Sequence, residues 1–224
     1  MTPGAIAVRG IAAYNWLRYL KVRIEGREFF PATGAALVAA RHYHHLFDGA
    51  VLVHGLPRQP HLFVALDWAR SPWERFVMET ACELADWPVA LRGDALRPGG
   101  SFAPREVARY VRRSLERGAT ILRRGDVLGM FPEGYPTIDP AGDRKDSDDA
   151  FLPFRPGMLA IVARAEATGA APVPIVPAGL AYARSARGFD VTLRLAAPLY
   201  LAAAPSRGAL LRDLETRVRA LSRN

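Results

Sequence analysis

The chain has 224 residues and half of them are hydrophobic, which is enough apolar sequence for one domain with a single buried core. Its one cysteine, Cys82, excludes an intramolecular disulfide framework and a zinc site built from several cysteines, so we expect a reducing compartment. The net charge is +8, and 28 of the 30 basic residues are arginines because only Lys21 and Lys145 are lysines. Arginines suit the phosphates of nucleic acids, lipid headgroups and small substrates, so charge alone does not choose among these partners.

Residues 1–20 are predicted to form an amphipathic helix ahead of a domain over residues 21–224. The apolar residues that share one face at helical spacing are Ile6, Ala13, Trp16, Leu17 and Leu20. Arg18 and Lys21 lie near this face, where they can meet anionic headgroups, and Arg9 lies within it. Because these charges interrupt the apolar residues and no cleavage-site pattern is present, we expect neither a signal peptide nor a membrane span. The helix either anchors the protein to a membrane surface or packs on the domain.

Beyond this helix, strands and helices alternate along the chain. Short strands are predicted at residues 21–26, 35–40, 62–66, 88–91, 126–131, 173–179 and 191–198. Helices are predicted at residues 46–54, at 72–84, from Pro104 onward, at 158–169, and in a C-terminal segment with Leu211, Leu214, Val218 and Leu221 on one face. The polar, turn-rich segment 135–157 is expected to be a loop on the active side of the sheet. The pattern predicts a single α/β domain with a mixed, largely parallel sheet flanked by helices.

All five histidines lie within residues 42–61, and three of them fall in the stretch RHYHHLFDGAVL at 41–52. A metal site here would use His42, His44 and Asp48. The spacing matches neither the two-histidine helical turn with an intervening glutamate nor the His-x-His-x-Asp-His pattern, in which Leu46 would have to be aspartate. We therefore expect no metal.

The same residues also fit a general base with an orienting acid. A neutral imidazole can take a proton from a hydroxyl, while a carboxylate on its other nitrogen fixes the tautomer and stabilises the imidazolium. The substrate's own alcohol then attacks an activated acyl group, so no nucleophilic side chain is needed, and backbone N–H groups or a cation hold the oxyanion. His45 and His54 are assigned to packing.

The stretch ALVAARHYHHLFDGAVL resembles the hallmark of glycerolipid acyltransferases of the lysophosphatidic acid acyltransferase type. In that family a strand ends in Asn-His, and an aspartate follows after four residues. Here Arg41 replaces the asparagine, and the family spacing would place the base at Tyr43. Alignment from the strand makes His42 the catalytic base, whereas alignment back from Asp48 favours His44. We favour His42 and keep both.

Further blocks resemble the same family in the same order over about residues 21–200. The segment WPVALR resembles the strand whose final arginine faces the substrate phosphate, which implies that role for Arg92. The family's Phe-Pro-Glu-Gly block is present as Phe131, Pro132, Glu133 and Gly134. The resemblance implies that Glu133 binds the acceptor headgroup or holds nearby backbone, and that Gly134 allows close approach to the substrate. The segment FRPGMLA resembles the Phe-Lys-x-Gly helix start, with Arg155 in place of lysine.

One departure leaves phosphate recognition open. The family usually continues with Thr-Arg-Ser, whereas this chain continues with Tyr135-Pro136-Thr137. Arg92, Arg155 or the pair Arg144-Lys145 could compensate for the missing arginine. Otherwise the acceptor is not lysophosphatidic acid.

The resemblance implies an acyltransferase of phospholipid biosynthesis. It would move a fatty acyl group from acyl-CoA or acyl carrier protein to the hydroxyl of a polar lipid. The acceptor would be a lysophospholipid, such as 1-acylglycerol-3-phosphate, or a related lipid. The thioester is a co-substrate, and no other cofactor is expected. We expect a cytoplasmic protein on the anionic inner face of the cell membrane. One alternative is a hydrolase that uses the same dyad with water as the acceptor. Another is a nucleic-acid-binding module that uses the arginines of residues 105–124, but it leaves the family blocks unexplained and no nucleic acid is expected.

Overall fold

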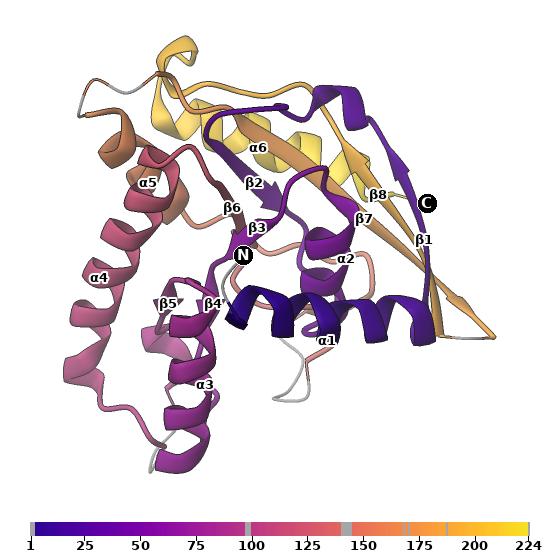
Figure 1. The fold of residues 1–224 in the computed structure, drawn as a ribbon. Coiled ribbons are helices and arrows are strands. Elements are labelled where there is room, and N and C mark those ends of the chain that lie inside the picture. Colours follow the sequence, from indigo (N-terminus) through magenta and orange to yellow (C-terminus); the bar gives the residue numbers. More distant parts are fainter. Residues whose placement is uncertain are drawn as a thin grey trace.

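Helices and strands alternate through the described part of the chain (Figure 1). The computed structural model describes residues 3–96, 100–139, 145–167, 169, 171–186 and 188–223. The helices are α1 (Pro3–Tyr19), α2 (Phe47–Gly55), α3 (Pro72–Leu84), α4 (Pro104–Arg123), α5 (Gly157–Glu166) and α6 (Arg207–Leu221). The strands are β1 (Leu20–Glu25), β2 (Ala36–Ala40), β3 (Pro60–Leu62), β4 (Val64–Ala65), β5 (Val89–Ala90), β6 (Val127–Met130), β7 (Ile175–Ser185) and β8 (Gly188–Leu195). Short 3-10 helices lie at Arg27–Phe29, Gly93–Ala95 and Leu201–Ala203.

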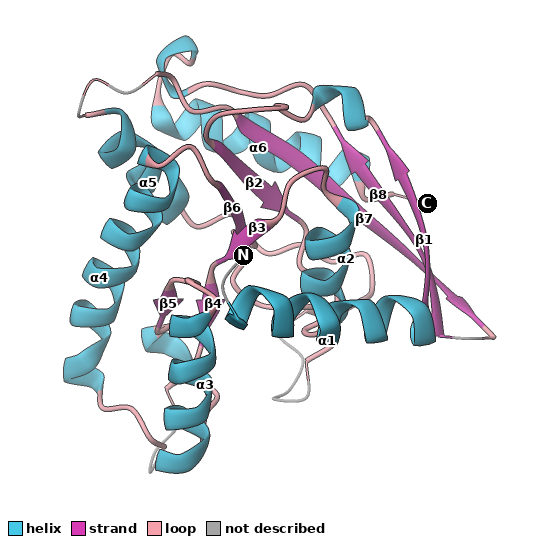
Figure 2. Cartoon of the chain, viewed as in Figure 1, coloured by secondary structure: helices cyan, strands magenta, loops and turns pink. Residues whose placement is uncertain are grey.

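Six of these strands form one sheet in the order β1-β8-β7-β2-β6-β3, and β4 pairs with β5 separately. Neighbouring strands of the larger sheet run parallel except for β7 and β8, which are antiparallel. Figure 2 shows the twisted sheet with helices packed around it. The prediction of a single α/β domain with a mixed, largely parallel sheet flanked by helices is confirmed.

The central strand β2 explains why helices cover both faces of the sheet. All five of its residues are completely buried. Successive side chains of a strand point to opposite faces. Val38 and Ala40 therefore lie in a core with α2, while Leu37 and Ala39 lie in a second core with α4, α5 and α6. In Figure 1, α1 and α2 lie on one side of the sheet and α6 lies on the other.

Capping residues set the helix starts that the sequence predicted. The Ser71 hydroxyl accepts the backbone N–H of Glu74 at 3.1 Å, and the Glu74 carboxylate accepts the N–H of Ser71 in return at 3.3 Å. The predicted start at Pro104 is also confirmed, and there the Glu106 carboxylate accepts the N–H of Ala103 at 2.8 Å.

The strand predicted at residues 62–66 is wrong, because two short strands of different sheets replace it. The backbone N–H of Phe63 donates to Gly129 O in β6, whereas the N–H of Val64 donates to Pro88 O next to β5. The chain therefore changes its hydrogen-bonding partner at Phe63. A continuous apolar run cannot show such a change of partner.

Two other elements differ in extent. The strand predicted at 173–179 begins at Ile175 and continues to Ser185, so it passes well beyond the prolines. In α6 the fully buried positions are Leu210, Leu214 and Val218, and the predicted Leu211 is only partly buried.

The predicted apolar face of α1 is wrong in part. Ile6 and Leu17 are exposed, but Leu20 is buried in β1 and Trp16 packs against the ring of His54. Arg9 does not lie among exposed apolar side chains. Its guanidinium reaches Gln59 Oε1 at 3.4 Å, and its carbonyl oxygen lies 3.0 Å from His54 Nε2. The helix packs through Ala12 and Asn15, and the apolar side chains that it exposes include Ile6 and Leu17 of the predicted face together with Ile11 and Tyr14.

Candidate active site

Three neighbouring strands bring the candidate residues to one edge of the sheet. β2 and β6 are parallel neighbours, so His42 after β2 lies beside Glu133 after β6. On the other side of β2, the parallel strand β7 continues past the end of β2 and carries Tyr182 to the same place. α2 begins a few residues after His42, and its first turn contains Asp48.

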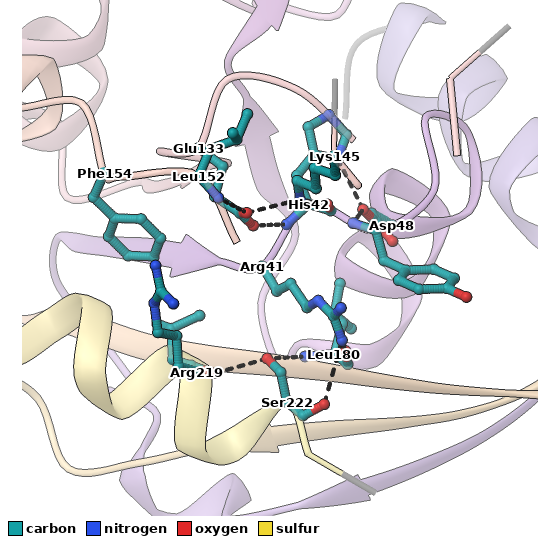
Figure 3. Close-up of polar contacts among 12 residues, drawn as sticks. Arg41, His42, Asp48, Glu133, Lys145, Leu152, Phe154, Leu180, Arg219 and Ser222 are labelled. Atoms are coloured by element: carbon teal, nitrogen blue, oxygen red, sulfur yellow. Dashed lines mark hydrogen bonds and ion pairs between the residues drawn. The ribbon is translucent and has the colours of Figure 1, made fainter. Parts of the chain in front are cut away.

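His42 and Asp48 form a hydrogen-bonded pair at this edge. His42 Nδ1 lies 2.8 Å from Asp48 Oδ2, and the Asp48 side chain is fully buried. The same oxygen accepts the backbone N–H groups of Tyr43 at 2.6 Å and His44 at 3.0 Å, while the Tyr182 hydroxyl donates to Oδ1 at 2.6 Å. Figure 3 shows the two side chains facing each other. An ionised carboxylate can only accept, so the Nδ1 that faces it carries the hydrogen.

The His42 ring is held on its face as well as at its edge. Phe131 stacks on it with a centroid distance of 4.4 Å and an interplanar angle of 18°. The side chain is 15% exposed. Among the described residues none hydrogen-bonds Nε2, so this nitrogen can accept a proton from a bound hydroxyl.

His44, the alternative base, points elsewhere. Its Nδ1 accepts the backbone N–H groups of Leu46 at 3.2 Å and Phe47 at 3.4 Å, and its ring stacks on Phe47 at 4.1 Å. Burial is the main reason that the pKa of His44 is lowered to about 4, and the neighbouring His45 lowers it further. The negative charge of Asp48 raises this pKa, but by less. His44 therefore serves as a neutral acceptor at the start of α2, and only its backbone touches Asp48.

Glu133 is buried and both of its carboxylate oxygens have partners. Oε1 accepts the backbone N–H of His42 at 2.8 Å, and Oε2 accepts the backbone N–H of Leu152 at 3.0 Å. Lys145 Nζ lies 2.7 Å from Oε2 and also donates to the carbonyl oxygen of His42 at 2.6 Å. Of the two uses expected for Glu133, these contacts support the holding of neighbouring backbone.

Arg92 lies in an ion pair rather than facing open space. Its guanidinium binds both carboxylate oxygens of Asp67, with Nε at 3.0 and 3.1 Å and Nη2 at 2.6 Å. Nη1 donates to the carbonyl oxygen of Gly134, and the ring of Tyr135 lies 4.1 Å from the guanidinium carbon. The Asp67 side chain is 1% exposed, so the charge of Arg92 is largely neutralised inside the protein.

A cavity of about 230 Å³ lies next to Glu133. Its lining residues are Asp94, Glu133, Tyr135, Leu152, Pro153 and Arg155. The Tyr135 hydroxyl and Arg155 Nη2 both donate to Asp94 Oδ2, at 2.8 and 3.0 Å. Burial opposes the ionisation of Asp94, but these hydrogen bonds outweigh it and lower its pKa. Gly134, at φ 79°, allows the close approach of the Arg155 side chain, which a Cβ at that position would crowd.

The sequence did not reveal the roles of Tyr182 and Asp67, or that Arg41 holds neighbouring backbone segments together. The buried Arg41 guanidinium donates to the carbonyl oxygens of Asp148, Leu180 and Ser222, the last two at 3.3 Å. Its position next to His42 was the only signal in the sequence. Tyr182 and Asp67 lie far along the chain from their partners and carry no local signal. Arg144, considered for phosphate binding, lies outside the described residues.

Within the described ranges, no group of three or more histidine, cysteine, aspartate or glutamate side chains is arranged to hold a metal ion. His42 and Asp48 bond to each other, and the His44 ring turns toward α2.

A family model described as Acyltransferase matches residues 21–181. The fold is similar to that of the 1-acyl-sn-glycerophosphate (LPA) acyltransferase PlsC from Thermotoga maritima, with a TM-score of 0.60. The two chains are 18% identical, and the match covers 96% of this chain and 77% of that chain. At this identity the likeness establishes a shared fold. No curated protein sequence matches the chain.

Proposed function

The chain belongs to the acyltransferase family, and on that premise we propose that it moves a fatty acyl group from an acyl thioester to the hydroxyl of a lysophospholipid or a related polar lipid. The donor would be acyl-CoA or acyl carrier protein. The observation that carries the proposal is the 2.8 Å contact between His42 Nδ1 and the buried Asp48, beside the Phe131–Gly134 block. This arrangement suits general-base catalysis with an orienting carboxylate.

In the proposed reaction, His42 Nε2 takes the proton of the acceptor hydroxyl while the oxygen of that hydroxyl attacks the thioester carbonyl carbon. Asp48 stabilises the imidazolium that forms. The tetrahedral intermediate then collapses, the carbon–sulfur bond breaks, and the imidazolium returns its proton to the leaving thiolate. The products are an ester and a free thiol, and His42 ends neutral.

The test is an assay of thiol release from acyl-CoA with a panel of lysophospholipids, with lipid products identified by mass spectrometry. His42→Ala should abolish transfer, whereas His44→Ala should retain most of it, because only the His42 ring bonds to Asp48. Loss of activity in His44→Ala with retention in His42→Ala would contradict the assignment of the base. Free fatty acid as the main product would show that water is the acceptor.

We also propose that the enzyme acts on the cytoplasmic face of the cell membrane, where its lipid substrates lie. In the described residues no helix is long and apolar enough to cross a membrane. The outward face of α1 supports surface binding. Its exposed apolar side chains are Ile6, Ile11, Tyr14 and Leu17. Arg18 is exposed beside them and can meet lipid phosphates.

A second apolar stripe supports the same location. The exposed apolar residues of α3 include Trp73, Phe76, Val77 and Leu84, and they recur at helical spacing. α1 and α3 are in contact, because Gly4 of α1 packs closely against the backbone at Leu84 and Ala85. Exposed apolar residues that follow a helical stripe indicate a surface that binds lipid or protein.

Vesicle sedimentation tests this location with the triple variant Ile6→Gln, Ile11→Gln, Leu17→Gln. Full burial of each such side chain is worth about 1.5–3 kcal/mol, so the loss of three removes at least about 4.5 kcal/mol and the triple variant should bind vesicles at least about 1,000-fold more weakly. In a control variant Phe29 and Tyr200, two exposed apolar residues outside α1 and α3, are changed to Gln. Binding should also weaken with salt on phosphatidylglycerol vesicles. Equal binding by both variants would remove α1 as the anchor.

A further inference from the structure

Lys145 occupies an unusual position for a lysine. Its side chain is fully buried, and it is one of only two lysines in a chain whose other 28 basic residues are arginines. It lies in the polar segment that follows the Phe131–Gly134 block. Lysine is almost never fully buried without a partner. The partner here is Glu133, whose side chain is also fully buried.

Together, Lys145 and Glu133 bind both backbone polar groups of His42. The N–H of His42 donates to Glu133 Oε1 at 2.8 Å, and its carbonyl oxygen accepts from Lys145 Nζ at 2.6 Å. The ion pair between them, Nζ to Oε2 at 2.7 Å, closes the arrangement (Figure 3). We call these two side chains the backbone clamp.

The clamp replaces hydrogen bonds that the sheet no longer supplies. The backbone N–H of Arg41 still donates to Ala178 O on β7, at 3.1 Å, but β2 ends at Ala40 and His42 lies beyond it. A buried backbone group without a partner is costly, so both groups of His42 need one. Side chains from the neighbouring strand end and from the polar segment supply these partners.

We propose that Lys145 is a positioning residue for acyl transfer, which acts with Glu133 by holding the backbone of His42 so that the imidazole stays between Asp48 and the acceptor. The inference rests on the proposed function for its catalytic consequence, although the clamp itself can be observed without substrate. Asp48 and Phe131 constrain the ring, and the clamp constrains the peptide groups from which the ring projects.

The charge of Lys145 makes the clamp sensitive to pH. Burial lowers the pKa of Lys145, Glu133 raises it in part, and Arg41 lowers it further while Asp48 raises it. These are the charged groups that face it, from the ends of β6 and β2 and from α2. A neutral amine would leave Glu133 buried without its cation, so turnover should fall as pH rises through the lowered pKa of Lys145.

The first variant is Lys145→Met, which keeps the length of the side chain and removes its charge. A matched control is Arg212→Met, the same loss of charge at an exposed position of α6. We expect kcat of Lys145→Met to fall by about 100-fold with KM within about twofold, since small misplacements of a catalytic group cost about this much. The alkaline limb of the wild-type pH–kcat profile should also disappear. A kcat within threefold of the wild type would overturn the proposal.

Because Lys145→Met leaves Glu133 unpaired and can fail to fold, the second variant is Lys145→Met with Glu133→Gln. It removes both charges and should recover thermal stability but not kcat. If it recovers both, Lys145 is only structural and the proposal fails. A third readout needs no substrate: hydrogen exchange of the His42 backbone amide should accelerate at least tenfold in Lys145→Met with Glu133→Leu, which leaves this amide without its acceptor, and stay unchanged in Arg212→Met. If wild-type protein acylates no lipid, the proposed function fails, while unaltered exchange would separately refute the clamp.

Discussion

Replacing Asp48 by asparagine should lower the rate of acyl transfer by about three orders of magnitude while the fold stays intact. The carboxylate has no exposed surface and accepts four hydrogen bonds, three on Oδ2 and one on Oδ1. An asparagine can place its oxygen at the Oδ2 position and keep the donors His42, Tyr43 and His44. Its amide then faces the Tyr182 hydroxyl, which can rotate and accept. The geometry therefore survives and only the charge is lost.

The magnitude follows from that charge. Two unit charges about 4 Å apart attract each other by about 4 kcal/mol at the effective dielectric constant of about 20 that suits protein sites. In the proposed reaction the imidazolium of His42 forms as the hydroxyl proton is taken, so this attraction stabilises the transition state and lowers the barrier. At about 1.4 kcal/mol for each factor of ten, its loss slows turnover by about 1,000-fold.

The assay is kcat for thiol release from acyl-CoA with a saturating lysophospholipid acceptor, with melting temperature as the control for folding. KM should change little, because Asp48 has no exposed surface with which to touch substrate. Turnover of Asp48→Asn within threefold of the wild type, in a protein that melts normally, would refute the general-base assignment. A large loss of melting temperature would instead refute the argument that asparagine satisfies the same donors.

Three further results are expected. The pKa of His44 is about 4 in the folded protein, against an ordinary value of 6.5, so the unfolded chain binds more protons between these two pH values. The free energy of unfolding should therefore fall as pH decreases from about 6.5 to 4. In urea titrations His44→Gln should flatten this pH dependence. Arg92→Met leaves the buried Asp67 carboxylate unpaired and should lower the free energy of unfolding by about 3–5 kcal/mol. Adding Asp67→Asn should recover part of this loss. An unchanged free energy of unfolding in Arg92→Met would contradict the ion pair. Tyr182→Phe removes one donor from Asp48 and should cost about 1–3 kcal/mol of stability, measured by the same method.

The sequence by itself determined most of the helices and strands, and the family. Periodic apolar residues and capping residues such as Ser71 and Pro104 mark helices, because these signals act within a few residues of the chain. The motif blocks placed His42, Asp48 and Glu133 in one site, because each block follows a strand and parallel strands end at the same edge of the sheet.

Only the tertiary structure distinguished the two histidines. His42 and His44 lie six and four residues before Asp48, and both spacings allow contact through an irregular segment. The segment between β2 and α2 turns the His42 ring toward Asp48 and the His44 ring toward Phe47. Spacing specifies how far a side chain can reach in a regular element, but in a loop the direction depends on what packs around it.

The contacts that support the site were also beyond the sequence. Tyr182 reaches Asp48 across 134 positions, Lys145 reaches the carbonyl of His42 across 103, and Arg92 pairs with an aspartate 25 residues earlier. Each pairing depends on which strands become neighbours and how far a strand such as β7 extends. Local propensity cannot specify this, because the free energy that selects strand partners comes from burying the whole core at once.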